Sequence, residues 1–253
     1  MKRRSRKCIG GKDRRQEGLP KDLLLMPPRK PMANFRLLLL ETKGMQRREE
    51  LVNTLTHGLG IPLSLLALVL LFQSGWESQN ILYLTALLLY GLTMLLTYLS
   101  STFYHLFHRA PAPRRRLLHL LDHSAIYLYI AGTYTPIALF VLPGLWSWGI
   151  FGAVWAIALL GVIFKVFFLG RFPKLSLVLY LLMGWLILVA FRPLWQQASA
   201  DLLLWMLAGG LCYTLGTIFF SWRSLRYHHG IWHLMVLAGS ICHFVGIYAF
   251  LGP

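Results

Sequence analysis

The sequence predicts an all-α membrane protein: a seven-transmembrane helix bundle with a cytoplasmic N-terminus and a C-terminus outside. The first observation is composition, since 57% of the 253 residues are hydrophobic and only 13% are charged. A soluble domain of this length needs far less apolar surface. The second observation is that apolar stretches of membrane-crossing length recur along the chain. The third is that basic residues alternate between the loops, which predicts the orientation.

Seven apolar stretches follow one another, each near the roughly 20 residues that a helix needs to cross the hydrocarbon core. Barrel strands would instead show alternating segments of about ten residues. The fifth stretch is the shortest. The predicted spans are 54–73, 81–105, 118–141, 146–168, 175–191, 202–220 and 231–251.

The orientation follows from Lys and Arg in the short loops, because cytoplasmic loops carry an excess of both. Loops that follow the second, fourth and sixth spans hold eight basic residues, whereas the alternate loops hold one, Arg192. The eight are Arg109, Arg114, Arg115, Arg116, Arg171, Lys174, Arg223 and Arg226. This bias places both the N-terminus and the 109–116 loop in the cytoplasm.

The N-terminal region differs from the rest, so we expect two parts: 1–44, and a seven-helix transmembrane domain at 45–253. Fifteen of the 25 Lys and Arg residues lie in residues 1–48. We expect 1–44 to be a disordered basic leader or the product of a misplaced start, with Met45 as the true one. The net charge of +16 alone does not indicate nucleic acid, and we expect no nucleic-acid partner. Membrane lipids are the expected partners, in a multi-pass protein of the plasma (inner) membrane.

Polar side chains from three distant stretches are predicted to meet near the cytoplasmic ends of the spans. His229 and His233 are four residues apart and share one helix face. With a rise of about 1.5 Å per residue, their depth overlaps that of His105. Three neutral imidazoles with an open fourth position are typical of a catalytic zinc site, so we expect Zn²⁺ as the cofactor. Interfacial or hydrogen-bonded core histidines are the competing interpretation.

Two further residues are predicted to perform chemistry beside that site. Asp122 is the only carboxylate within a predicted span, where an unpaired acid is costly. It would hold or deprotonate a zinc-bound water, or else pair structurally with Arg116 or a histidine. Ser101 lies one turn before His105 and would orient a ligand or the acid, although a lone Ser often bonds only its own helix.

A polar run before the first span, Glu50, Asn53 and His57, shares one helix face at the same membrane side. These residues either support the metal site or form only an interfacial helix start. The sequence contains no Walker A motif and no GxGxxG pattern beside a strand, so no nucleotide or redox cofactor is expected.

These motifs, Glu50-x2-Asn53-x3-His57, Ser101-x3-His105, Asp122 and His229-x3-His233, resemble those of the progestin and adipoQ receptor family. The chain is most similar to its bacterial branch, hemolysin III, over about residues 47–252. The resemblance implies a seven-helix bundle with the N-terminus inside, zinc held by the three histidines, and Asp122 at the metal-bound water. Family members are linked to hydrolysis of lipid amides, to haemolysis and to control of membrane fluidity or energetics.

Three functions therefore compete. The first is a zinc-dependent hydrolase of lipid amides or esters, and the second is a non-enzymatic sensor or regulator of membrane fluidity or energetics. The third is a cytolysin, against which the seven apolar spans argue because they indicate a resident membrane protein.

Overall fold

The computed structural model describes residues 32–252, which form helices and short connections without a strand. The described residues belong to two units, one that ends at Met45 and one that starts at Gln46. In the first unit, residues 1–31 of the expected leader lie outside the described residues. Residues 32–44, for which the sequence predicts no fold, are helical and begin α1. These residues contain four consecutive leucines and no proline, a composition compatible with a helix.

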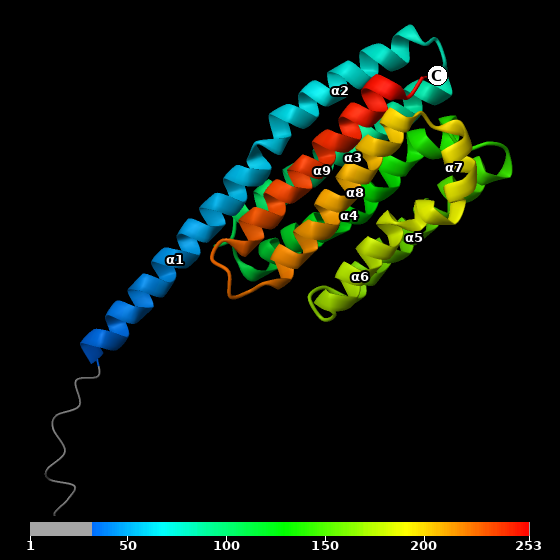
Figure 1. The fold of residues 1–253 in the computed structure, drawn as a ribbon. Helices are drawn as coiled ribbons and strands as arrows, with labels where there is room; N and C mark the ends of the chain where they lie inside the picture. The colour runs from blue at the N-terminus through cyan, green and yellow to red at the C-terminus, as the bar shows by residue number, and fades with distance from the viewer. Residues whose placement is uncertain (1–31, 253) are drawn as a thin grey trace, which may run out of the picture. The chain divides into compact units, whose positions relative to one another are not determined.

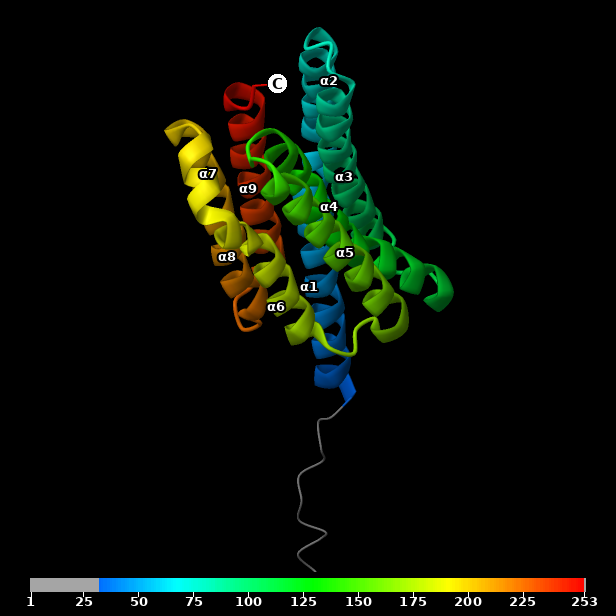
Figure 2. The same ribbon diagram turned by 90° about the vertical axis from the view of Figure 1, so that its right-hand side faces the viewer.

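Most helices follow the predicted spans, but α1 begins well before the first of them and the fifth span is divided among several helices. In chain order they are α1 Met32–Gly58, α2 Gly60–Glu77, α3 Ile81–Leu106, α4 Ala112–Phe140, α5 Leu145–Phe168, α6 Pro173–Gly184, the 3₁₀ helix η2 Leu186–Ala190, α7 Phe191–Gln197, α8 Ala200–Ser221 and α9 His228–Phe250. Within residues 46–253, α3 packs along α4 and α4 along α5, while α8 packs along α9 (Figures 1 and 2).

Six helical segments of the described chain are long and apolar enough to cross a membrane, as an all-α membrane protein requires. One of them, Gly44–Glu77, joins the end of α1 to α2. Only Leu59 separates these two helices, and its N–H still donates to Leu55 at 3.0 Å. Pro62 lacks an N–H for the Gly58 carbonyl, which explains a local break in an otherwise continuous helix.

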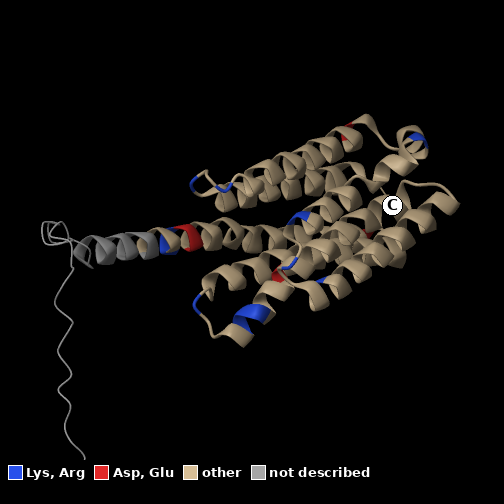
Figure 3. Ribbon diagram, turned by 90° about the horizontal axis from the view of Figure 1, so that it is seen from below, with Lys and Arg blue, Asp and Glu red and all other residues tan. Residues whose placement is uncertain are grey.

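Helix α4 is the predicted span that does not belong to these six. Its 29 residues include Arg114, Arg115 and Arg116 in the first two turns and Asp122 further along, and these charges lower its apolar character. Because α4 lies against both α3 and α5, much of its surface contacts protein rather than lipid, and polar residues are tolerated there. The count of seven spans and the orientation of the termini therefore stay predictions. Figure 3 shows Lys and Arg gathered near one end of the helices, with little at the other.

The fifth predicted span is a broken helix, made of α6, η2 and α7. The Tyr134 hydroxyl lies at the break, where it donates to the Gly184 carbonyl at 2.8 Å and accepts from the Ile187 N–H at 2.8 Å. These bonds satisfy backbone groups that an uninterrupted helix would pair itself. The predicted apolar stretch ends at Arg192, which lies in α7.

Hydroxyl groups tie four helices together in the interior. The Tyr98 hydroxyl of α3 donates to Ser240 of α9 at 2.7 Å. The Tyr213 hydroxyl of α8 lies 3.2 Å from Ser240 and 3.2 Å from that of Tyr129 on α4. Interhelical hydrogen bonds of this kind stabilise helix pairs in lipid, where no hydrophobic force drives association. They hold α3 and α9 beside each other, and these are the helices that carry the histidines.

Candidate metal centre

The three predicted ligands come from two helix ends. His105 lies in the last turn of α3, and His229 and His233 lie in the first two turns of α9. Helix α9 begins after Tyr227, whose left-handed backbone (φ 58°) turns the chain into the helix. Gly230 then allows close approach to α1, since a Cβ there would lie only 2.7 Å from Val52 Cγ1. This approach brings the start of α9 against the segment that holds Asn53.

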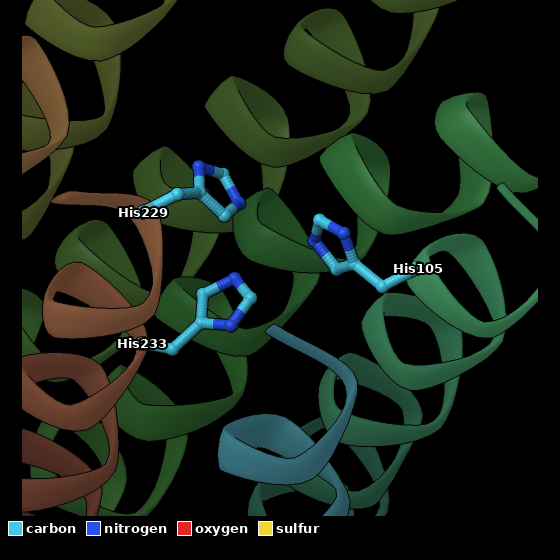
Figure 4. Close-up of side chains that lie close together, drawn as sticks. All are labelled: His105, His229 and His233. Carbon is cyan, nitrogen blue, oxygen red and sulfur yellow. The ribbon is translucent and has the colours of Figure 1, made fainter. Parts of the chain in front are cut away.

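The three imidazoles converge on one point (Figure 4). Each of His105, His229 and His233 offers a ring nitrogen, and these three atoms all lie within 4.8 Å of one another. The His105 and His233 side chains are 4% and 0% exposed, respectively, and His229 is partly buried. The three histidines therefore have the spacing and the donor atoms to bind a metal ion.

Hydrogen bonds fix the rings of His105 and His233. The Nδ1 atom of His105 lies 2.7 Å from Oε2 of Glu50. The Nδ1 atom of His233 lies 3.2 Å from the Asn53 carbonyl oxygen and 3.1 Å from the Thr56 hydroxyl oxygen. Carboxylates and carbonyls only accept, so each Nδ1 carries a proton, and the neutral form of each ring then presents a lone pair at Nε2.

Whether the site fits a metal depends on what surrounds the two Nε2 atoms. The Nε2 atoms of His105 and His233 are buried and have no hydrogen-bond partner among the described residues. An unpartnered buried acceptor costs about 1–3 kcal/mol, and coordination to a cation would remove this cost. A metal-binding histidine usually donates its other ring N–H to a carboxylate or carbonyl, as both do here. The arrangement fits a metal held by three nitrogens.

Comparison with known proteins agrees with this architecture. The sequence profile of the family described as haemolysin-III related matches residues 45–244. The chain belongs to the haemolysin-III related family. It is 42% identical to Hemolysin-3 of Bacillus cereus over 206 residues, which cover 81% of this chain and 93% of that protein. Identity to the Hemolysin-3 homolog of Bacillus subtilis is 41% over 204 residues, 78% of this chain and 92% of that protein.

A more distant relative is the human Monocyte to macrophage differentiation factor, 27% identical over 213 residues, which cover 80% of this chain and 84% of that protein. The resemblance drawn from the sequence motifs is thereby confirmed. Because six helical segments of the described residues are long and apolar enough to cross a membrane, this member of the haemolysin-III related family is a multi-pass membrane protein.

Asp122 and Ser101 lie together beside the histidines of this haemolysin-III related protein. The Ser101 hydroxyl on α3 is next to the Asp122 carboxylate on α4, and His105 is close enough to interact electrostatically with that carboxylate. Ser101 is buried and Asp122 is partly buried. Among the described residues, Asp122 does not belong to the group of close ligand atoms.

The polar run of α1 reaches the site through three different contacts. Glu50 contacts His105 through its side chain, whereas Asn53 contacts His233 through its backbone carbonyl. His57 stacks on His233, with ring centroids 3.5 Å apart and planes at 17°. The His57 ring is buried, and neither of its nitrogens has a hydrogen-bond partner among the described residues.

Sequence reasoning missed two residues near the site. Lys165 lies in the last turn of α5, where it is only 3% exposed, and its ammonium group donates to the Ser176 hydroxyl at 2.7 Å. Lys165 also attracts the Asp122 carboxylate. A lysine within an apolar run is the signal that could have identified it, because intramembrane charges are rare. Thr56, which contacts His233, carries no comparable signal.

Proposed function

We propose that this protein is a zinc-dependent hydrolase that acts on a lipid amide or ester at the cytoplasmic ends of its helices. The observation that carries the proposal is the pair of buried, unpartnered Nε2 atoms on His105 and His233, with His229 as the third nitrogen. Three histidines with one open position are the usual ligand set of catalytic zinc sites. The nitrogen ligands favour zinc over magnesium or calcium, which prefer oxygen ligands.

The described residues support a division of labour in the reaction. A bound zinc ion would supply Lewis acidity, polarising a carbonyl and lowering the pKa of coordinated water toward about 7. Asp122 would accept a proton from the attacking water and return it to the leaving amine or alcohol. Ser101 would hold the Asp122 carboxylate in one orientation, and Lys165 would attract its negative charge. Glu50 would orient His105 and increase the basicity of its Nε2.

The substrate class rests on the surroundings of the site. The three histidines lie on helices that are apolar enough to cross a membrane, so a carbonyl compound dissolved in the bilayer would reach their depth. A lipid amide or ester supplies both the apolar body and the reacting carbonyl.

The experiment combines zinc content with product release. Purified wild type is incubated with a panel of lipid amides and esters, and products are measured by mass spectrometry beside Asp122→Asn and Ser101→Ala. Asp201→Asn, an exposed acid in the first turn of α8, is the matched control. We expect Asp122→Asn to keep its zinc and lose turnover by about 10²–10⁴-fold, as removal of a general base does. Ser101→Ala should reduce turnover partially, and the control should equal wild type.

A second candidate function is a membrane-state sensor, and the joining of α1, α3 and α9 at the histidines favours it. A metal ion there would couple the relative positions of three helices without turnover. If zinc-loaded wild type released no product from any lipid, the hydrolase proposal would be rejected and the sensor proposal would stand.

A further inference from the structure

A cavity separate from the three histidines opens where α3 ends, α4 begins and α5 leads into α6. Its volume is about 510 Å³. Three arginines line it: Arg115 and Arg116 from the first turns of α4, and Arg171 from the connection after α5. Two separate elements therefore bring positive charge to one hollow, near the end of the helices where basic residues gather (Figure 3).

This positive charge is not neutralised within the described residues. No carboxylate lines the cavity, and none of the three arginines forms an ion pair in the described part of the chain. Glu50 is close enough to Arg115 to interact electrostatically, but its carboxylate hydrogen-bonds to His105. Guanidinium groups present paired N–H donors that match the oxygens of a phosphate. The cavity thus has the charge and the donors for an anion.

Additional hydrogen-bonding groups lie in the same cavity. The rings of Tyr104 and His119 stack with centroids 5.0 Å apart, and both residues line the hollow. The Tyr104 hydroxyl lies close to Arg115. A phosphate placed among the arginines would find a neutral hydroxyl and an imidazole at its side.

One wall of the cavity is apolar and faces outward. Phe167, Phe168 and Leu169 at the end of α5 form this wall, and Phe167 is 72% exposed. Exposed apolar side chains continue from it along α5, including Leu159 and Ile163, one helical turn apart. An arginine-lined hollow that opens onto an apolar helix surface matches an amphipathic ligand with a phosphate head and an acyl chain.

We propose that this cavity binds the phosphate of an anionic membrane lipid, with Arg115, Arg116 and Arg171 on the phosphate and the acyl chain along α5. The site is distinct from the three histidines and does not depend on whether they hold a metal. Basic pockets between helices at the cytoplasmic face are the setting in which anionic headgroups bind.

Native mass spectrometry of the full chain tests the site with phosphatidylglycerol and phosphatidylcholine as probes. We expect wild type to retain phosphatidylglycerol preferentially, and Arg115→Gln/Arg171→Gln to lower that retention at least about tenfold, since two charge-assisted contacts are lost. Arg223→Gln/Arg226→Gln removes the same charge from exposed residues of the connection between α8 and α9 and should retain the lipid. Unchanged melting temperatures of both double variants would show that the comparison concerns binding.

Two results would overturn the proposal. Equal loss of phosphatidylglycerol in both double variants would mean that diffuse surface charge, not this cavity, attracts the lipid. Displacement of the lipid by excess inorganic phosphate would mean that the cavity takes a soluble anion. Failure of inorganic phosphate to compete, together with loss in the cavity variant alone, supports a lipid site. If the double variant does not fold, Arg171→Gln, in the connection, provides the same comparison against Arg223→Gln.

Discussion

Removal of the Glu50 carboxylate should weaken metal binding without removing a ligand. Glu50 Oε2 lies 2.7 Å from His105 Nδ1, the shortest hydrogen bond to any of the three histidines. Loss of such an outer partner typically costs 10–100-fold in metal affinity, about 1.4–2.7 kcal/mol. We expect Glu50→Ala to show this full loss. Glu50→Gln should lose less, because an amide oxygen still accepts from the Nδ1 proton but carries no charge.

The assay is zinc affinity by competition with a chelator, on purified full-length protein. Glu49→Ala is the matched control, because its side chain forms no hydrogen bond or ion pair in the described part of the chain. Wild type and Glu49→Ala should bind zinc with equal affinity. Glu50→Gln should bind more weakly, and Glu50→Ala most weakly. Wild-type affinity in Glu50→Ala would refute the role assigned to this carboxylate.

Three further predictions concern the fold. Gly161→Ala should destabilise the protein by about 1–3 kcal/mol, since its Cβ would lie 2.5 Å from Tyr127 Cε1; Gly152→Ala on the same helix has open space and should melt like wild type. Reporters fused after residue 112 and at the C-terminus should lie on opposite sides of the membrane, with the C-terminus outside; reporters on one side would contradict seven spans. A chain that starts at Met45 should insert, bind zinc and melt like the full chain, and loss of any of these would give residues 1–44 a structural role.

Most of the long helices could be predicted from the sequence because local composition marks them, whereas residues 32–44 of α1 were not predicted to fold. The start of α3 at Ile81 and the end of α5 at Phe168 agree with the predicted spans. The break between α6 and α7 could not be predicted, because it depends on a hydroxyl from another helix, Tyr134. Likewise, α4 tolerates its polar residues because it packs between two helices, a tertiary property.

The candidate site shows the same division. The convergence of His105, His229 and His233 could be predicted, because spacing and depth are readable from the chain. The hydrogen-bond partners of their ring nitrogens were harder to predict from the sequence. Glu50 shares a helix face with Asn53, yet it contacts His105 by its side chain and Asn53 contacts His233 by its backbone. A backbone carbonyl has no sequence signature. Lys165 was overlooked, because its partner, Ser176, comes from the next helix.

Zinc content is the most direct test of the metal centre. Wild type and the His229→Ala/His233→Ala double variant, purified without added chelator, would be analysed by inductively coupled plasma mass spectrometry. The three-nitrogen site predicts about one zinc per wild-type chain and almost none in the double variant, which keeps a single ligand. The double variant should also melt at a lower temperature, because zinc no longer stabilises the folded state. Stoichiometric zinc in the double variant would contradict the site.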